Sequence, residues 1–265
     1  MSRDVPVPIV VKLGGSCLDD LAGAWWDDLA GHAAQHPLVL VHGWSKPLSR
    51  FSERYRDPSA FLRDRYGNRS RWTTPEVIDD IKTVSAELAD DVTARLAARG
   101  IPVERLLGSD GLVQAGPGET WWWQGKQLVE LENLVGPITK VDPARLGTLR
   151  PGYAHLVTPL ARDGADREVN TDADRAAAAI AGALAATSLV LVTDVAHLLI
   201  EGRPVTRIDA EAAAAFRDRG ATGGMRKKLR AACEALEQGV REVVLGSGPV
   251  SELLSGRTGT TITRG

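Results

Sequence analysis

Three short motifs supply lysines, carboxylates and glycines in patterns that could bind a phosphoryl group. They are Lys12-Leu13-Gly14-Gly15-Ser16, Asn170-Thr171-Asp172-Ala173-Asp174 and Thr222-Gly223-Gly224-Met225-Arg226-Lys227-Lys228. Together they contain two lysines, a carboxylate that could orient both, and glycine loops at the starts of helices. Phosphoryl transfer depends mostly on positioning and on neutralising charge, so it needs parts of this kind. Each motif alone is a weak signal.

The first motif follows an apolar run that predicts a buried strand, Ile9-Val10-Val11. Ligands of open α/β sheets collect at the carboxyl ends of strands, and glycines let backbone N–H groups approach a phosphate closely. A plain strand-to-helix turn with a solvated Lys12 would show the same residues. The motif is neither a Walker A loop nor a GxGxxG fingerprint.

The second motif carries two aspartates at the start of an alanine-rich helix, Asp172 and Asp174. An aspartate at this place is usually an N-cap. Two carboxylates together with Asn170 exceed what one cap needs, and one of them could hold two lysines in position. The pattern does not decide which aspartate has which role.

The third motif sets Lys228 in the first turns of a helix that begins after Gly223-Gly224. A cation near a helix N-terminus opposes the helix dipole, and a bound anion would offset that. Arg226 and Lys227 flank Lys228, so the pattern leaves open which of them points inward. A solvated basic turn is the alternative.

Strand and helix signals alternate along the chain and favour an α/β class. Continuous apolar runs predict buried strands at 9–13, 38–41, 189–192 and 242–245, a further strand starts at 101–103, and helices are predicted at 21–34 and 75–99. Apolar runs between helices indicate a mainly parallel sheet covered on both faces. The glycine- and proline-rich stretch 108–148 predicts antiparallel strands, with a hairpin turn at Gln124-Gly125.

Composition bounds the class of protein. The chain has 265 residues, 43% of them hydrophobic and 25% charged, and its net charge of -2 argues against nucleic-acid binding. Cys17 and Cys233 match neither a disulfide framework nor a metal-ligand spacing, so we expect reduced thiols, no metal site and a cytoplasmic location. Residues 1–8 do not resemble a signal peptide, and Thr187-Ser188 interrupts the apolar stretch 176–192, so we expect no membrane span.

Two further segments suggest contact surfaces. The stretch 50–71 holds seven arginines and three acids, interleaved with aromatic residues, and indicates an anionic partner, although a solvated loop fits equally well. In a strand, Trp121-Trp122-Trp123 would leave at least one indole on the outer face, as a contact surface or substrate wall, and packing between lobes is an equal alternative. Gly43-Trp44-Ser45 could present N–H groups to an anion, whereas His42 fits a structural role because no nucleophile pairs with it.

Taken in order, these motifs resemble those of the amino acid kinase family, and within it the acetylglutamate kinase branch. The matching patterns cover nearly the whole chain: Lys-x-Gly-Gly at 12–15, His-Gly at 42–43, Arg-x-Thr at 71–73, Asn-x-Asp-x-Asp at 170–174, Thr-Asp-Val at 193–195 and Gly-Gly-Met-x-x-Lys at 223–228. The resemblance implies a three-layer α/β/α sandwich with a mainly parallel central sheet. It implies one domain over 1–265, with an acceptor-binding lobe at 1–170 and an ATP-binding lobe at 171–265. A homodimer through the helix that begins near Pro75 is also implied.

The resemblance further implies that ATP, with Mg²⁺ on its phosphate oxygens, phosphorylates a carboxylate to an acyl phosphate. Lys12 and Lys228 would neutralise the transferred group, and Asp174 would orient the two lysines. The acceptor would be bound by Gly43, Trp44, Arg71 and Asn170. The nucleotide site would be lined by Gly14, Gly15, Thr193, Asp194, Val195, Thr222 and Gly223.

Residues 70–74 and 170–174 resemble one subgroup, the LysW-aminoadipate kinase type, whose glutamate or 2-aminoadipate is carried on a small acidic amino-group carrier protein. By that resemblance the carrier would dock on Arg50, Arg54, Arg56, Arg63, Arg65 and Arg69. Two features depart from the family: Trp44 replaces the usual glycine, and the run at 121–123 has no counterpart. The alternatives are a kinase for free N-acetylglutamate and a catalytically silent binding protein on the same fold.

Overall fold

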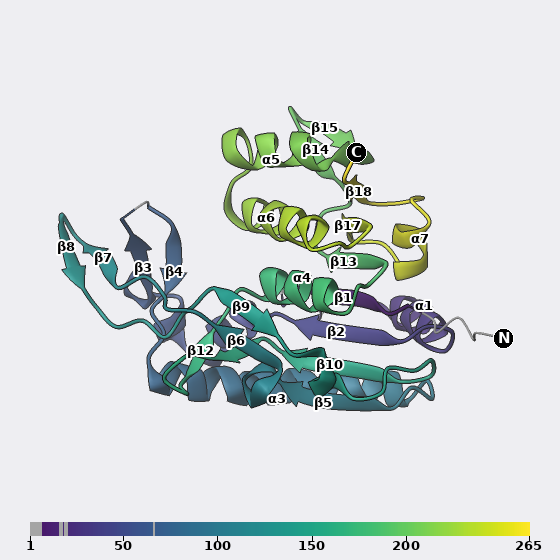
Figure 1. The fold of residues 1–265 in the computed structure, drawn as a ribbon, viewed down its shortest axis with the longest axis horizontal. Helices are drawn as coiled ribbons and strands as arrows, with labels where there is room; N and C mark the ends of the chain where they lie inside the picture. Colours follow the sequence, from purple (N-terminus) through teal and green to yellow (C-terminus); the bar gives the residue numbers. More distant parts are fainter. Residues whose placement is uncertain (1–6, 16–17, 19–20, 66) are drawn as a thin grey trace.

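An eight-stranded sheet forms the centre of the computed structural model, which describes residues 7–15, 18, 21–65 and 67–265 (Figure 1). Neighbouring strands are parallel except for the pair β17–β18. In spatial order the strands are β16 (Arg207–Asp209), β18 (Thr260–Thr263), β17 (Glu242–Gly246), β13 (Ser188–Val192), β1 (Ile9–Leu13), β2 (Leu38–His42), β10 (Ala154–Thr158) and β5 (Val103–Leu107). The mainly parallel sheet expected from the apolar runs is confirmed.

Alternation along the central strands produces two separate apolar clusters, one on each face of the sheet. Val10, Val41 and Leu189 belong to one cluster, and Val11, Leu40 and Val190 belong to the other. Successive side chains of a strand point to opposite faces, so a strand with helices on both sides is apolar at every position. This explains why the central strands read as uninterrupted apolar runs.

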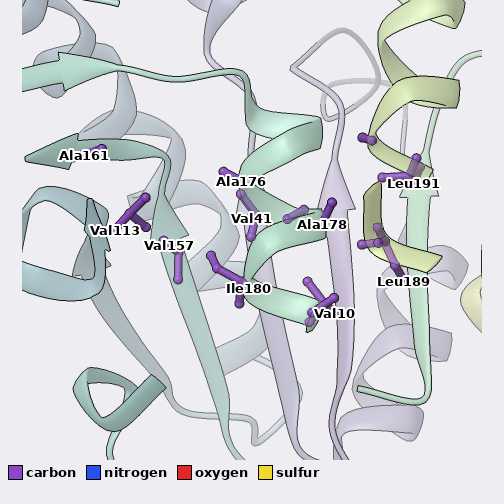
Figure 2. Packing of buried hydrophobic residues seen from close by; sticks show 14 of the residues in the cluster. Val10, Val41, Val113, Val157, Ala161, Ala176, Ala178, Ile180, Leu189 and Leu191 are labelled. Carbon is purple, nitrogen blue, oxygen red and sulfur yellow. The ribbon is translucent and has the colours of Figure 1, made fainter. Parts of the chain in front are cut away.

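Helices cover both faces of the sheet and complete the three-layer sandwich. The helix α4 packs with Ile180 and its alanines on the first cluster, as Figure 2 shows. α6 lies beside α4, whereas α1 and α7 pack on the opposite face. The helices are α1 (Gly23–Ala33), α2 (Ser45–Phe51), α3 (Pro75–Ala97), α4 (Ala173–Ala183), α5 (Ala210–Arg219), α6 (Gly223–Glu237) and α7 (Val250–Leu254).

The long helix α3 begins where its sequence predicts. Thr74 is the N-cap, its hydroxyl accepts from the Val77 N–H, and Pro75 occupies the first turn. Proline is tolerated there because the first N–H groups of a helix have no partner within it. The helix runs beside β5, and its apolar residues contribute to both clusters (Figure 1).

The described residues also form three smaller sheets besides the central one. A four-stranded sheet in the order β4-β3-β7-β8 stands away from the central sheet as an arm (Figure 1). Its strands are β3 (Phe61–Asp64), β4 (Arg69–Arg71), β7 (Trp121–Gln124) and β8 (Gln127–Glu130). The others are the sheet β12-β11-β6-β9 and the hairpin β14–β15, formed by β12 (Glu168–Asn170), β11 (Leu160–Arg162), β6 (Val113–Ala115), β9 (Ile138–Val141), β14 (Leu198–Ile200) and β15 (Arg203–Val205).

The hairpin expected in the glycine-rich stretch is present, but its turn lies one residue later than predicted. Gly125 and Lys126 form the turn, and Gly125 has a φ of 62°, a conformation that glycine adopts without a steric penalty. The turn takes this position because Gln124 pairs with Gln127 as the last rung of the ladder.

Several predictions fall partly or wholly outside the described residues. Ser16, Cys17, Tyr66 and the charged start at 1–6 belong there.

Other predictions concern described residues. Cys233 is a buried free thiol. None of the helices in the described ranges combines the length and apolar character needed to cross a membrane. The predicted strand start at 101–103 lies at Val103.

Candidate functional site

A cleft of about 1000 Å³ brings the three motifs together at the carboxyl ends of β1 and β13. The Lys12 Nζ lies 2.7 Å from Asp174 Oδ1, and the Lys228 Nζ lies 3.2 Å from Asp174 Oδ2. All three residues line the cleft, and Lys12 and Asp174 are each 6% exposed. A carboxylate therefore lies between two lysines from distant parts of the chain, in a place where water screens their charges weakly.

The direction of Lys12 follows from the alternation of β1. Lys12 lies two residues after Val10 on β1, so both side chains project to the same face of the sheet, and the Val10 side chain faces α4. At the C-terminal end of the strand this direction aims the ammonium group at the first turn of α4. Asp174 occupies that turn, where its negative charge also interacts favourably with the helix dipole.

The two aspartates of the second motif have different roles. Asp172 is the N-cap of α4, and its carboxylate accepts from the N–H groups of Asp174 and Arg175. The cap leaves the Asp174 carboxylate available for the lysines. The two arrangements that the motif left open therefore both occur, one at each aspartate.

Packing between α4 and α6 brings Lys228 to the same carboxylate. Arg175 on α4 contacts Glu234 on α6, with 2.7 Å between Nε and Oε2. Of the three basic residues that the sequence left undecided, Lys228 points inward, with its side chain 13% exposed. Lys227 is more open and pairs with Asp172 at 3.3 Å. Arg226 and Lys227 also line the cleft.

The electrostatics of the cluster favour a bound anion. Burial opposes ionisation of Asp174, but the charges of Lys12 and Lys228 outweigh it and lower the pKa of the carboxyl to about 2. Asp174 is therefore ionised at neutral pH. Two ammonium groups around one carboxylate leave an excess of positive charge, which a phosphate group can neutralise.

Arg71 lies buried in the same cleft, with a relative exposure of 7%. Its Nη1 donates to the Tyr55 carbonyl at 3.3 Å, and its guanidinium lies over the Phe61 ring at 4.6 Å. No carboxylate in the described part of the chain forms an ion pair with it, and burial lowers the pKa of Arg71. A buried guanidinium without a carboxylate is costly, so the site is suited to an anionic ligand.

Asn170 connects the cleft to the start of α3. Its Nδ2 donates to Thr73 Oγ1 at 3.3 Å, and the Asn133 Oδ1 accepts from the Thr73 N–H at 2.7 Å. The Asn170 Oδ1 is buried and makes no hydrogen bond within the described part of the chain. A ligand with an N–H donor would satisfy that oxygen.

The turn after β2 closes one wall of the cleft. Gly43 and Trp44 both line it, but the Gly43 N–H already donates to the Leu13 carbonyl at 2.9 Å and is not available to an anion, contrary to our expectation. A Cβ atom on Gly15 would lie 2.5 Å from the Gly43 carbonyl oxygen, so the two glycine turns meet backbone to backbone. Trp44 is 7% exposed, and its indole belongs to the core cluster.

His42 has the surroundings of a structural residue. Its Nε2 pairs with Thr158 Oγ1 at 2.9 Å in the buried interior. Burial, followed by the charge of Lys12, lowers the pKa of the ring to about 4, so His42 is neutral at pH 7.

The residues expected around a nucleotide divide into two groups. Gly14, Gly15, Thr193 and Gly223 line the cleft, and Gly223 has a φ of 54° at the start of α6. Asp194, Val195 and Thr222 lie on the adjoining turns and are not among the residues that line the cleft. Within the described ranges, no group of three or more histidine, cysteine, aspartate or glutamate side chains is arranged to hold a metal ion.

The six arginines expected to dock a partner are in different environments. Arg54, Arg56 and Arg65 form ion pairs with acids of the same chain: Arg54 with Glu76 and Asp80, Arg56 with Glu53, and Arg65 with Glu119. Arg63 and Arg69 instead line the cleft. Arg50 is exposed on α2.

The structure adds cleft and support residues that the motifs did not single out. The Phe61 ring lies against the guanidinium groups of Arg69 and Arg71. The sequence offered one signal for this: in a strand, Phe61 and Arg63 are two residues apart and project to the same face. Lys46 also lines the cleft. It directly follows Gly43-Trp44-Ser45, the turn that the sequence indicated as a possible anion site. Thr158 lies on β10, which had no sequence signal because His155 and Thr158 interrupt its apolar run.

Comparison with known proteins agrees with this architecture. A profile of the Amino acid kinase family matches residues 8–247. The acetylglutamate kinase of Bacillus cereus (strain 03BB102) is 33% identical over 266 residues, which is 97% of each chain. A putative LysW-aminoadipate/LysW-glutamate kinase of Aeropyrum pernix is 34% identical over 266 residues, covering 96% of this chain and 97% of the relative. The chain belongs to the amino acid kinase family, and the expectation of a phosphotransferase is confirmed.

Solved structures agree on the fold. N-acetylglutamate synthase from Neisseria gonorrhoeae, complexed with coenzyme A and N-acetyl-glutamate, superposes with a TM-score of 0.75 at 23% identity, covering 98% of this chain and 60% of that one. Carbamate kinase from Giardia lamblia, bound to AMP-PNP, superposes with a TM-score of 0.67 at 14% identity, covering 98% and 99%. The three-layer α/β/α sandwich is therefore confirmed.

Proposed function

We propose that this protein uses ATP to phosphorylate the side-chain carboxylate of an N-blocked acidic amino acid, of the glutamate or 2-aminoadipate type, and yields an acyl phosphate. The observation that carries the proposal is the pairing of Asp174 with Lys12 and Lys228 in a cleft that also contains Arg71, a buried guanidinium with no carboxylate partner among the described residues. One end of such a cleft suits a transferred phosphoryl group, and the other suits a second anion.

The chemistry asks for charge neutralisation rather than proton removal. A carboxylate acceptor is already ionised at neutral pH, so its oxygen can attack the γ-phosphorus without a general base. The neutral, hydrogen-bonded His42 fits this requirement. Lys12 and Lys228 offset the repulsion between two anions, and loss of either should lower the rate by roughly 10²–10³-fold.

Arg71 and Asn170 are proposed to bind the acceptor. A guanidinium can pair with the acceptor's second carboxylate, and the unsatisfied Asn170 Oδ1 can accept from the N–H of a blocked amino group. Gly43 and Trp44 would form the wall beside it. The Trp44 indole is buried in the core cluster, so the acceptor would contact the turn itself rather than the full face of the indole.

The opposite end of the cleft is proposed to bind ATP, with residues 171–265 as the nucleotide lobe and 1–170 as the acceptor lobe. Gly14, Gly15, Thr193 and Gly223 would contact the nucleotide within the cleft, with Asp194, Val195 and Thr222 on the adjoining turns. Mg²⁺ would sit mainly on phosphate oxygens, because the lysines already occupy the Asp174 carboxylate. When bound, the ion would neutralise further phosphate charge.

The acceptor's carrier is a finer part of the proposal. We propose that the amino acid is carried on a small acidic amino-group carrier protein, because Arg63 and Arg69 extend the cleft beyond Arg71 with positive charge. A kinase for free N-acetylglutamate is the alternative, and a catalytically silent binding protein on the same fold is the second alternative.

We further propose a homodimer through α3, which sedimentation velocity would test.

The test is ATP-dependent acyl-phosphate formation trapped as a hydroxamate. Free N-acetylglutamate is compared with glutamate or 2-aminoadipate linked to an acidic carrier protein, with Lys228→Gln as the inactive control. Turnover of the carried acid alone supports the carrier, and efficient turnover of the free acid selects the alternative. ATP binding without turnover of either would support the silent-fold alternative.

A further inference from the structure

Arg71 has no carboxylate partner among the described residues, so neutral groups must hold its buried guanidinium in place. Tyr55 supplies two of these groups. Its backbone carbonyl accepts from the Arg71 Nη1 at 3.3 Å, and the centroid of its ring lies 5.4 Å from the guanidinium carbon. That ring distance is within the range of cation–π attraction. The position of Tyr55 therefore helps to decide where the guanidinium points.

Tyr55 lies on a local element that is too short to fix it. It is the last residue of a single 3₁₀ turn, Glu53–Tyr55, and hydrogen-bond geometry in such turns is poorer than in an α-helix. The Tyr55 side chain is nevertheless only 2% exposed and belongs to the first apolar cluster. Tertiary contacts of that side chain must therefore hold the Tyr55 carbonyl against Arg71.

A hydrogen bond to α3 anchors the Tyr55 side chain. Its hydroxyl donates to the Asp80 carboxylate and accepts from the Arg54 Nη2 at 2.7 Å. Arg54 also donates to the same carboxylate. Burial, followed by the hydrogen bond to Asp80, raises the pKa of Tyr55 to about 12, so the hydroxyl remains a donor at neutral pH. A hydrogen bond to an ionised acceptor is stronger than one between neutral groups, so Tyr55 is firmly tied to the second turn of α3.

The same helix also fixes the backbone of Arg71. Arg71 is the last residue of β4, and Thr74, three residues later, is the N-cap of α3. α3 therefore acts on Arg71 twice, on its backbone through the short connection and on its guanidinium through Asp80 and Tyr55. An arginine side chain has several rotatable bonds, and holding it in advance lowers the entropic cost of binding a ligand.

We propose that Tyr55, anchored by Asp80, is a positioning residue that holds Arg71 for the second carboxylate of the acceptor. This inference rests on the proposed function, because that function assigns the second carboxylate to Arg71. The N–H groups of a guanidinium form a rigid fork, so pairing with a carboxylate depends on direction as well as distance. Without the anchor the guanidinium would stay in the cleft but rotate away from the carboxylate. The loss should therefore appear in acceptor binding and not in the phosphoryl-transfer step.

The test compares N-acetylglutamate with its α-amide, in which a neutral group replaces the second carboxylate. Tyr55→Phe removes the hydroxyl and keeps the ring and the carbonyl. For N-acetylglutamate we expect KM to rise roughly tenfold, the scale of one hydrogen bond to a charged group, with kcat and the KM for ATP within about twofold of wild type. For the α-amide we expect no such rise, because this acceptor has no carboxylate for Arg71.

Two assays supply these constants. Hydroxamate formation gives kcat and KM, and calorimetric titration gives the dissociation constant of each acceptor. If only a carried acid reacts, glutamate linked to the acidic carrier protein is compared with its own α-amide in the same way.

Further variants separate positioning from packing. Asp80→Ala removes the acceptor of the hydrogen bond, while Arg54 keeps its pair with Glu76, and it should raise KM for N-acetylglutamate by a similar factor. The KM of the double variant should not exceed that of the single variants, because both changes remove the same contact. Tyr153→Phe is the matched control. It also removes a hydroxyl from a tyrosine whose ring lies under an arginine, Arg150 at 5.0 Å, but Tyr153 does not line the cleft.

The outcomes distinguish this inference from the proposed function. If Tyr55→Phe raises KM equally for the acid and its α-amide, or changes neither, Tyr55 does not act through Arg71 and the inference is wrong, while the kinase activity stands. If the wild type phosphorylates no acceptor, but Tyr55→Phe weakens binding of the acid and not of the α-amide, the inference is supported and the proposed function is overturned. If the wild type neither binds nor phosphorylates any of these acceptors, both are overturned.

Discussion

Replacing Asp174 by asparagine keeps the shape of the side chain and removes its charge. In the folded protein the carboxylate accepts from Lys12 at 2.7 Å and from Lys228 at 3.2 Å. The amide cannot balance either ammonium group, so two buried cations would face each other across a neutral residue. Both the stability of the fold and the rate of phosphoryl transfer should therefore fall.

The size of the stability loss follows from the pKa of the carboxyl. A shift from the ordinary 3.8 to about 2 corresponds to about 2 kcal/mol of stabilisation of the charged form at neutral pH. Removing one partner of a buried ion pair costs about 3–5 kcal/mol, so we expect a loss of about 2–5 kcal/mol. Because the folded-state pKa is lowered, this contribution is present above pH 3.8 and disappears as the pH falls through 2. The variant should show none of this pH dependence.

Urea denaturation at pH 7 measures the stability, and hydroxamate trapping measures a kcat expected to fall by roughly 10²–10³-fold. Asp172→Asn is the matched control. It makes the same change from carboxylate to amide, but at the N-cap of α4 rather than between the two lysines. Asparagine is an equally good cap, and the exposed pair with Lys227 contributes at most about 1 kcal/mol. An Asp174→Asn enzyme with a kcat within about threefold of wild type, or an Asp172→Asn enzyme that loses as much, would refute the reasoning.

Three further predictions concern other parts of the cleft. Arg71→Gln should raise KM for the acceptor roughly 10–100-fold with little change in KM for ATP, because a charge-assisted hydrogen bond contributes about 1.5–3 kcal/mol. Gly15→Ala should cost about 1–3 kcal/mol in thermal or urea unfolding and lower kcat, since its Cβ would lie 2.5 Å from the Gly43 carbonyl oxygen. The pKa of His42 is about 4 in the folded state against 6.5 ordinarily, so the unfolded chain binds more protons between these values. Stability should therefore fall as the pH drops from 6.5 to 4, by up to about 3 kcal/mol, and His42→Gln should flatten the curve.

Each of these predictions has a result that would contradict it. Equal rises in KM for acceptor and ATP in Arg71→Gln would show that Arg71 does not belong to the acceptor end. An alanine at Gly15 with wild-type stability would mean that the two turns can separate freely. A pH profile of unfolding unchanged by His42→Gln would leave the acid sensitivity to other groups, such as His32, whose pKa burial also lowers to about 4.

Local signals were sufficient for much of the fold. The apolar runs at 9–13 and 189–192 mark the centre of the sheet because strands buried on both faces are apolar at every position. Thr74 and Pro75 mark the start of α3 because capping depends on a few neighbouring residues. β10 was missed since His155 and Thr158 break its apolar run, although tertiary packing buries both.

The amino-acid sequence by itself determined the residue types of the site, their order along the chain, and the strand and helix that carry each. It also implied the family, which the comparisons confirmed. It could not decide which of Asp172 and Asp174 contacts the lysines, or which basic residue of α6 points inward. Those choices depend on contacts between residues 54 or more positions apart, such as the pair of Lys228 with Asp174.

Only the tertiary structure decided which arginines near the cleft pair with acids of the same chain and which line the cleft. Arg54, Arg56 and Arg65 have acids of their own chain as partners, whereas Arg63 and Arg69 line the cleft. The sequence shows a run of arginines, but charge pairing depends on which acids the fold brings within a few ångströms. The four-stranded arm likewise depends on pairing between strands about fifty residues apart in the chain, and no local pattern contains that pairing.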